Sequence, residues 1–545
     1  MNRRHVSSAR ANVCGLSVFL GITATLWGQN LGSTPSSPGL YYSSAKAGPG
    51  VGWEGSTTRG AAISIWAKNV GSTRGSSFVT VAGVPLTSNS DYAEWGATTH
   101  PTTAKGFQRI TFWLNSSMSA GNTAGIYLTV NGVQSNILPF IVNNTGVIRF
   151  IDGAHGNDSW DGKYKDHTLG HSHGPWKTAF MYYQRAGTGP GTFFYMRAGT
   201  YTAIFDPSSG HPASAYIGYF EQGTTSCNVS YPQINGTDAL RYTVASYPGE
   251  LAVFRGVTVS NKSSYWTLAN FRWTDTPNFV YGMGDEWSMC ARCQLRSVGL
   301  ELVGMQFDGY MHHAVHSFGD NFKIVANYIN MIPVSAGGYD AATSYPLYLS
   351  SGDNLLVADN EIHGGGMYSI HHYDEARCYG SDLKRAMNNS TFDSNLLDIT
   401  RSAENPINMK AGVLTGINIP GKAYTNTVIK NNIVYSRDHL VSESGIKLFS
   451  ETATVLDGVH IYNNTLHNVP RGLEVIYSTI GHWRNVDLVN NIFSNVGSYE
   501  IYVDGGSAVD IRPNFQYNLV GRVPRVNGDA DLSNNVIASN VVTVG

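Results

Sequence analysis

The sequence is poor in charge. Only 14% of its 545 residues are charged, and the formal net charge is −2. Such a chain offers no basic face to a polyanion and has no acidic tail, so nucleic acid is not expected as a partner. The sequence also lacks a phosphate-cradling loop, a dinucleotide-binding glycine motif and a Gly-x-Ser-x-Gly turn. We therefore set aside the chemistries that depend on these motifs.

Cysteine is scarce too, with five residues. Cys14 lies in "VCGLSVFLGITATLW", an apolar stretch that follows two arginines near the start and is typical of a secretory signal peptide over residues 1–28. We expect export of a bacterial type, extracellular or periplasmic, with no membrane contact after signal removal. Four cysteines then remain, and the isolated Cys290-x-x-Cys293 pair favours a local disulfide or buried thiols over a zinc site.

Glycine and tyrosine are abundant, with 60 and 31 residues. Residues 29–56 have the Gly, Ser and Pro content of a linker. Residues 57–145 alternate in short bursts, "AAISIWA", "SSFVTVAGVPL", "QRITFWLN", "AGIYLTVNG" and "NILPFIV", which predicts an antiparallel β-sandwich. This pattern resembles the immunoglobulin-like IPT/TIG modules of secreted bacterial proteins, and the resemblance implies a spacer or binding accessory.

A repeat runs through residues 146–545. Segments such as "ANYIN", "DNEIH", "SNLLD" and "NNIVY" place an Asn two residues before an aliphatic or aromatic side chain, and the anchors recur every 27 to 37 residues at Asn327, Asn360, Asn395, Asn432, Asn464, Asn491 and Asn518. Such a period indicates a solenoid with a fixed strand frame and variable loops. We interpret the Asn column as structural, since stacked amides can hydrogen-bond along the axis.

The start of this region contains "GNDSWDG", "GPWKT", "PGTFFYMRAGTY" and "ASYPGELAVFRGV". These segments resemble the entry coils of secreted right-handed parallel β-helix proteins, the pectate-lyase-like superfamily of polysaccharide lyases and glycoside hydrolases. The resemblance implies an all-β chain in which a β-sandwich precedes a right-handed parallel β-helix. It also implies a polysaccharide as partner, and we expect a monomer.

One strand of each coil can be aligned by its alternating aliphatic residues, which point inward. Their outward neighbours form a row of His316, Tyr348, His371, Asn408, Lys447, Glu474 and Tyr502, beside a second row that holds Tyr373, Lys410 and Phe449. His372 falls on the inward side and is read as a core histidine. Proton carriers, cations and aromatic rings in one row predict a groove several sugar units long, with His316 and Asn408 as substrate-binding residues. The loops beyond His372 add Asp374, Glu375, Asp382 and Arg401 to that set.

The chemistry that this row favours is β-elimination from a uronic-acid-containing polysaccharide. That reaction needs a cation for the uronate carboxylate, a base and a proton donor. Lys410 or Lys447 would be base or neutraliser, His371 a base, and Tyr348 or Tyr373 the donor. Lyases of this superfamily often bind calcium through an acidic cluster; no compact cluster of that kind is evident in the sequence, so no cofactor is assigned and a calcium ion stays the one candidate.

Two alternatives stay open. Glu404 and Glu443 lie four residues before Asn408 and Lys447, so the same alignment stacks two carboxylates on adjacent coils, as a glycoside hydrolase would need. Asp374, Glu375 and Asp382 on the long loop offer a second possible carboxylate pair. The other alternative is a scaffold that binds carbohydrate without cutting it, which the β-sandwich and the tyrosine content would equally suit.

Overall fold

The computed structural model describes residues 37–98, 105–167, 172–178, 189–202, 205–206, 211–212, 235–255, 259–260, 264–275, 281–284, 298–317, 319–335, 340–349, 352–374, 387–400, 411–417, 423–438, 444–450, 455–477, 482–504, 514–521, 525–527 and 534–537. The cysteines and the predicted signal peptide lie outside these residues. Residues 38–545 form one compact unit. No helix in the described ranges is long and apolar enough to cross a membrane.

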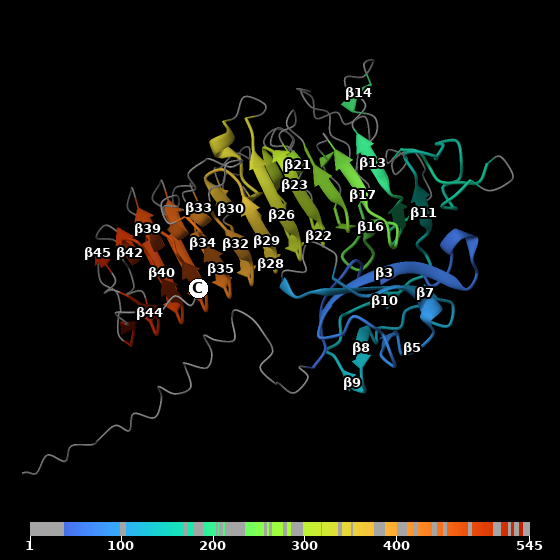
Figure 1. Ribbon diagram of the computed structural model, residues 1–545, viewed down its shortest axis with the longest axis horizontal. Helices are drawn as coiled ribbons and strands as arrows, with labels where there is room; N and C mark the ends of the chain where they lie inside the picture. Colours follow the sequence, from blue (N-terminus) through green and yellow to red (C-terminus); the bar gives the residue numbers. More distant parts are fainter. Residues whose placement is uncertain are drawn as a thin grey trace, which may run out of the picture. The chain divides into compact units, whose positions relative to one another are not determined.

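An antiparallel β-sandwich comes first (Figure 1). One of its sheets has the order β1 (Gly39–Ser43), β3 (Arg59–Lys68), β7 (Gln108–Asn115) and β6 (Tyr92–Ala97). The other has the order β5 (Val84–Leu86), β4 (Phe78–Val81), β8 (Ile126–Val130) and β9 (Val133–Gln134). A short parallel pair joins β2 (Ala47–Gly48) to β10 (Ile141–Val142), and 3₁₀ helices η1 (Trp53–Gly55) and η2 (Asn89–Asp91) lie in the connections.

The linker prediction for residues 29–56 is wrong over part of its length. Strand β1 pairs antiparallel with β3, and β2 pairs with β10, so these residues belong to the sandwich. The Gly, Ser and Pro content of this segment reflects tight connections between short strands rather than a free tether.

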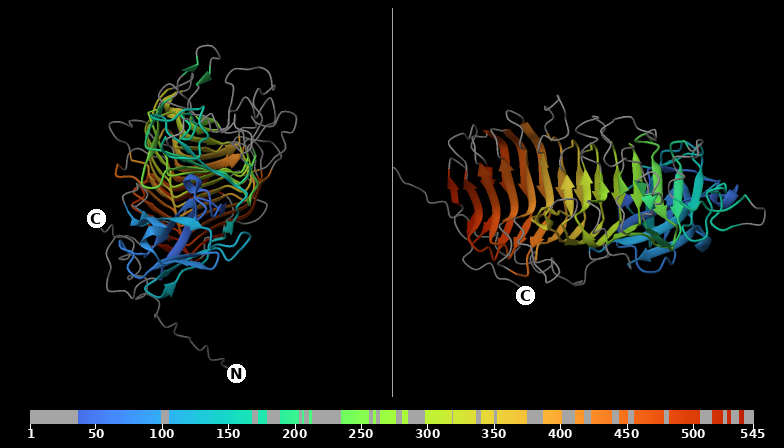
Figure 2. Two further views of the ribbon diagram at one scale, coloured as in Figure 1. Left: turned by 90° about the vertical axis from the view of Figure 1, so that its right-hand side faces the viewer. Right: turned by 90° about the horizontal axis from the view of Figure 1, so that it is seen from above.

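A right-handed parallel β-helix follows, in which successive coils contribute strands to three parallel sheets of 12, 12 and 10 described strands. Sheet I contains β11 (Ile148–Ile151), β12 (Phe193–Met196), β16 (Tyr242–Ser246), β19 (Trp266–Ala269), β22 (Glu301–Val303), β25 (Lys323–Val325), β28 (Leu356–Ala358), β31 (Thr391–Asp393), β34 (Ala423–Lys430), β37 (Val455–Tyr462), β40 (His482–Val489) and β43 (Asn514–Gln516). Figure 2 shows the strands of successive coils side by side along the coil axis.

Sheet II contains β13 (Gly199–Thr202), β17 (Ala252–Arg255), β20 (Arg272–Thr274), β23 (Gln306–Met311), β26 (Tyr328–Pro333), β29 (Glu361–Gly364), β32 (Leu396–Asp398), β35 (Ile433–Tyr435), β38 (Thr465–His467), β41 (Ile492–Ser494), β44 (Leu519–Val520) and β46 (Val536–Ile537). Sheet III contains β18 (Val259–Ser260), β21 (Tyr281–Gly284), β24 (His313–Ser317), β27 (Leu347–Leu349), β30 (Tyr368–Asp374), β33 (Ala411–Ile417), β36 (Ser444–Ser450), β39 (Arg471–Tyr477), β42 (Tyr499–Asp504) and β45 (Arg525–Asn527). A small hairpin of β14 (Phe205–Asp206) and β15 (His211–Pro212) and the 3₁₀ helix η4 (Ala341–Thr343) complete the described elements.

The asparagine column is the structural ladder that the sequence predicts. Asn327, Asn360, Asn395, Asn432, Asn464, Asn491 and Asn518 each donate from Nδ2 to Oδ1 of the next asparagine at 2.9 to 3.0 Å, and the ladder continues to Asn535. All seven are buried, at 1% exposure or less. Each follows a residue with positive φ, for example Asp359 at 54° and Asn431 at 56°. The ladder thus satisfies the polar groups of the tight turn between sheets I and II.

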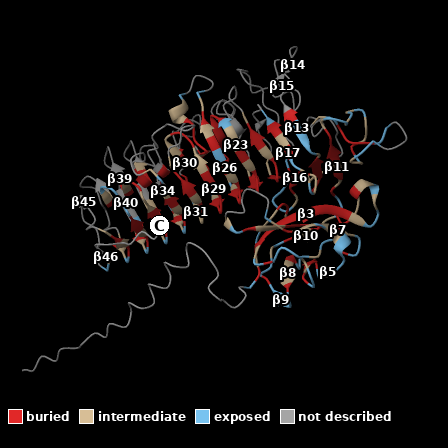
Figure 3. Ribbon diagram, viewed as in Figure 1, coloured by how far each residue is buried: buried red, intermediate tan, exposed pale blue. Residues whose placement is uncertain are grey.

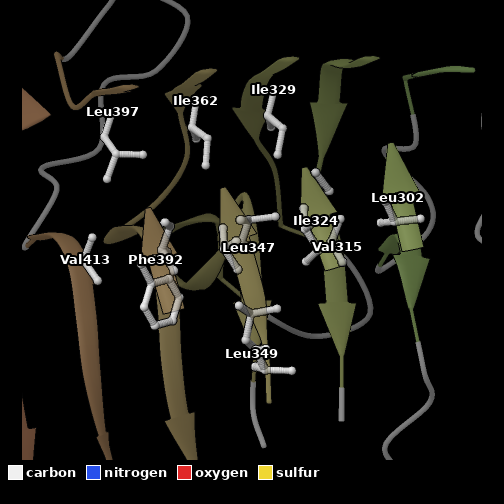
Figure 4. Close-up of a cluster of buried hydrophobic side chains, with 14 of the residues drawn as sticks. Leu302, Val315, Ile324, Ile329, Leu347, Leu349, Ile362, Phe392, Leu397 and Val413 are labelled. Carbon is white, nitrogen blue, oxygen red and sulfur yellow. The ribbon is translucent and has the colours of Figure 1, made fainter. Parts of the chain in front are cut away.

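The interior of the coil is packed with aliphatic and aromatic side chains (Figure 4). Figure 3 colours many residues of the coil strands as buried. The inward column of sheet III comprises Val315, Leu347, Ile370, Val413, Ile446, Leu473 and Ile501, none of them more than 1% exposed. Burying each such side chain contributes about 1.5–3 kcal/mol. The sequence predicts this column correctly except in one coil, where Val413 takes the place assigned to Ile407 and Met409.

The sandwich packs against the outer face of sheet I through one continuous apolar cluster that includes Trp66, Phe193 and Ala269. The contact is close, since a Cβ on Gly304 would come within 2.1 Å of the Trp66 ring. Polar contacts supplement it: the Tyr195 hydroxyl bonds both backbone groups of Ala62 at 2.8 and 2.9 Å. The sandwich is therefore anchored to the β-helix by apolar packing and by hydrogen bonds to buried backbone groups.

Candidate functional site on sheet III

The outward residues of sheet III form one continuous row across six strand pairings. His316, Tyr348, His371, Leu414, Lys447, Glu474 and Tyr502 lie opposite one another in that order, and we call them the outer row. Because parallel strands lie about 4.8 Å apart, the row extends for roughly 29 Å. It agrees with the predicted row except at one position.

That position corrects the predicted alignment. Leu414 of β33, and not Asn408, lies between His371 and Lys447, while Gly416 takes the place assigned to Lys410 opposite Tyr373. Both "NPINMK" and the next residues, "AGVLTGI", alternate apolar residues, and the chain pairs through the second stretch. Residues 401–410 lie outside the described residues.

Stacked rings make up the first half of the site. The rings of His316 and Tyr348 are parallel within 2° with centroids 4.4 Å apart, and Tyr348 lies 4.8 Å from His371. Tyr345 stacks on His371 at 4.5 Å, and Tyr368 stacks on it at 5.1 Å. The imidazole of His371 is thus enclosed by tyrosine rings from its own coil and from the preceding one.

His371 is buried and neutral. It is 5% exposed, and its Nδ1 forms no hydrogen bond to any of the described residues. Burial lowers the pKa of His371 to about 3, with a smaller contribution from the neighbouring His372. A buried ring nitrogen without a partner normally carries a free-energy cost, so this atom is suited to receive a ligand group.

The inward neighbour His372 behaves as a core residue, as predicted. It is fully buried, with Nδ1 2.9 Å from Oγ1 of Thr415 and Nε2 3.4 Å from Oγ of Ser390. Burial lowers its pKa to about 3 as well.

Charged groups make up the second half of the site. Glu474 is fully buried, yet its carboxylate accepts from the hydroxyl of Ser444 and pairs with Arg471 and Lys447, the latter at 3.5 Å. These three ionised side chains have a net charge of +1. Lys447 is itself only 8% exposed, and its Nζ lies 5.7 Å from the ring centroid of Phe449.

Phe449 links the two halves. Its ring centroid lies 6.1 Å from that of Tyr373, which in turn lies 5.7 Å from the His371 ring. The arrangement therefore brings together five residues that the sequence predicts for the site: His316, Tyr348, His371, Tyr373 and Lys447. Asp374 ends β30 opposite Ile417, and its side chain is not among those described.

The remaining predicted site residues lie outside the described residues: Glu404, Asn408, Lys410, Glu443, Glu375, Asp382 and Arg401. The alignment that stacked Glu404 on Glu443 does lose its basis, because it started from Asn408 opposite Lys447.

Other contributors were not assigned from the sequence. Glu474 is part of the predicted outer row, and its position next to Lys447 is the sequence feature that could have indicated an ion pair. Arg471 and Ser444 lie at the starts of their strands. Tyr345 lies in the connection before its strand, where the alternation of inward and outward residues does not apply and predicts no direction for the side chain. No group of three or more His, Cys, Asp or Glu side chains in the described ranges is arranged to hold a metal ion.

Comparisons with known proteins return solved structures only. No family model and no curated protein matches the chain. The chain is similar to pectate lyase Pel9A, with 13% identity, 67% of this chain and 79% of that one covered, and a TM-score of 0.36. It is also similar to an alginate lyase from Paenibacillus, with 13% identity, 57% and 91% covered, and a TM-score of 0.37. A surface adhesin of Streptococcus pneumoniae, PfbA, matches with 10% identity, 57% and 85% covered, and a TM-score of 0.33.

Proposed function

We propose that the protein is a secreted enzyme that cleaves a uronic-acid-containing polysaccharide by β-elimination at the outer row of sheet III. The observation that carries this proposal is His371, a buried neutral imidazole whose Nδ1 has no partner among the described residues and which lies between tyrosines in line with a cationic cluster. Base, proton donor and cation are the three groups that β-elimination needs.

In this mechanism Nδ1 of His371 removes the proton α to the uronate carboxylate. The electron pair of the broken C–H bond forms the new double bond, the C–O bond to the leaving sugar breaks, and the leaving oxygen takes a proton from Tyr348. A base with a pKa of about 3 is weak, but a bound carboxylate favours the imidazolium and raises that pKa. Substrate binding thus creates the base that the reaction requires.

Lys447 and Arg471 supply the attraction for the substrate. Together with Glu474 they leave one positive charge, which matches one uronate carboxylate. Lys447 lies two strands from His371, roughly 10 Å along the row, so the row would hold at least two sugar units at once. Cleavage within a chain held along this row fits a polymeric substrate better than a monosaccharide.

The test uses the mature protein with polygalacturonate, alginate and two neutral polysaccharides, a glucan and a mannan. Product is followed by the ultraviolet absorbance of an unsaturated sugar and, in parallel, by a reducing-end assay. A rise in both signals with a uronate polymer is expected. New reducing ends without ultraviolet absorbance would show that the enzyme is a hydrolase and not a lyase. No change in either signal would indicate a scaffold that binds polysaccharide without cleaving it.

A further inference from the structure

A second cluster of polar side chains lies on the outer face of sheet II, away from the outer row. His363 of β29 is held between two carboxylates, with Nε2 2.7 Å from Oε1 of Glu361 and Nδ1 3.3 Å from Oδ2 of Asp398. Asp398 also accepts from the Tyr435 hydroxyl at 3.0 Å and pairs with Arg437 at 3.2 Å. We call these five residues the Glu361 cluster.

One acceptor in this cluster has no donor among the described residues. Glu361 is 7% exposed, and its Oε2 is buried without a hydrogen bond from any residue in the described ranges. The carboxylate of Asp398, by contrast, has partners on both oxygens: His363, Tyr435 and Arg437 at Oδ2, and Thr400 at Oδ1. A buried carboxylate oxygen without a donor is costly, so this oxygen is suited to accept a hydrogen bond from a bound ligand.

The charges of the cluster restrict what that donor can be. The two carboxylates raise the pKa of His363 to about 9 against the opposing effect of its burial, so it is an imidazolium at neutral pH. The cluster then holds two anions and two cations. The ammonium of Lys105 also lies within electrostatic reach of Glu361, but it interacts with Asp359 and Asp393 as well. A balanced cluster attracts neither a polyanion nor a polycation, and a neutral hydroxyl donor suits it best.

Aromatic rings and strand spacing narrow the ligand further. The half-buried Tyr328 ring lies 5.6 Å from that of His363. Outward residues of successive strands, Asn330, His363, Asp398 and Tyr435, lie opposite one another in a polar row. Strands about 4.8 Å apart repeat at close to the length of one pyranose unit, and tyrosine faces stack on sugar rings.

We propose that the outer face of sheet II binds neutral oligosaccharides at the Glu361 cluster, with a sugar hydroxyl donating to Oε2 of Glu361 and a pyranose ring resting on Tyr328. This surface is separate from the outer row of sheet III, and it does not depend on the cleavage proposed there.

Binding can be tested by calorimetry on the full mature protein with hexasaccharides of glucose, mannose and galactose. We expect Glu361→Gln, which keeps Oε1 for His363, and Tyr328→Ala each to weaken binding about tenfold. Tyr328→Phe keeps the ring face and should bind like the wild type. Lys447→Met on sheet III should also bind the neutral ligand normally.

Each other outcome overturns the proposal. Binding of none of the neutral hexasaccharides would leave water as the donor to Glu361. If both Glu361→Gln and Tyr328→Ala bind normally, or if only Lys447→Met loses binding, the sugar binds at a site other than the Glu361 cluster. Thermal unfolding of every variant verifies folding, and if Glu361→Gln does not fold, the contrast between Tyr328→Ala and Tyr328→Phe decides. Calorimetry reports binding without cleavage, so failure here is distinguishable from failure of the lyase proposal.

Discussion

Lys447 and Glu474 lie directly opposite each other on neighbouring strands of sheet III, with the ammonium 3.5 Å from the carboxylate. Glu474 has no exposed surface, so its charge is tolerated only because Lys447, Arg471 and Ser444 surround it. The same contacts hold Lys447 in line with His371. The pairing with Glu474 therefore fixes the position of the Lys447 ammonium, and Lys447, Arg471 and Glu474 together carry one net positive charge.

Removing that charge should stop cleavage. We expect Lys447→Ala to lower the rate at least about 100-fold, because the uronate unit bound two strands from His371 loses the cation that holds the chain along the row. Arg471 and Ser444 still bind Glu474, so the fold should survive, as circular dichroism would verify. Lys163→Ala removes an exposed lysine and is the matched control. A wild-type rate in Lys447→Ala would refute the assignment of the groove.

His371→Ala should abolish cleavage while the fold remains intact, with a loss of about 100-fold to 10,000-fold expected for a general base. The substitution also leaves a cavity between the tyrosine rings, so added imidazole should restore part of the rate. Recovery that follows the free-base fraction of imidazole would identify a proton acceptor. His155→Ala, at an exposed histidine, should show neither loss nor rescue. Full activity without imidazole would remove His371 from the mechanism.

Stability should fall as the solution becomes acidic. His371 and His372 are buried neutral with pKa values of about 3, against 6.5 for the unfolded chain. Between these values the unfolded chain binds protons that the folded chain does not, so the free energy of unfolding decreases as the pH falls from about 6.5 toward 3. Urea midpoints at pH 7 and pH 4 measure this change.

A variant isolates the histidine contribution to that slope. In His372→Gln the overall stability should drop, because the contact with Thr415 changes, but the acid-dependent loss should become smaller. His155→Ala should leave the slope as it is. An unchanged slope in His372→Gln would show that His372 is already protonated in the folded protein.

Much of the fold was readable from the sequence because it is periodic. The Asn anchors and the alternating aliphatic residues recur in every coil, so the inward column of sheet III was predicted at Val315, Ile370 and Ile446. The prediction is wrong in one coil, because two adjacent stretches show the same alternation of apolar residues. Only the pairing with the neighbouring strands selects Val413 over Ile407. A period-two pattern does not specify register when the competing stretch has the same pattern.

The candidate site was predictable only where it follows a strand. His316, His371 and Lys447 were found because they share one outward row. The Glu361 cluster was not found, because Glu361 and Asp398 are distant in sequence and their pairing through His363 appears only once sheet II is assembled.

The asparagine ladder should be sensitive to a single break. Asn432 donates to the Phe392 carbonyl and to Asn464, and its Oδ1 accepts from both the backbone and the side chain of Asn395. Asn432→Ala leaves these buried groups unpaired, and we expect a loss of about 2–4 kcal/mol in unfolding free energy. Asn330→Ala, at an exposed asparagine of β26, should change it by less than about 0.5 kcal/mol. Equal urea midpoints for the two variants would show that water replaces the amide.

The sandwich should unfold together with the β-helix. The buried Tyr195 hydroxyl donates to the Ala62 carbonyl and accepts from the Ala62 N–H, so Tyr195→Phe leaves both backbone groups without this partner and should cost about 1–3 kcal/mol. Tyr310→Phe, at an exposed tyrosine, should cost nothing measurable. A spacer module that is independent of the β-helix would give two calorimetric transitions, with the variant affecting at most one. A shared interface predicts a single transition that Tyr195→Phe moves as a whole.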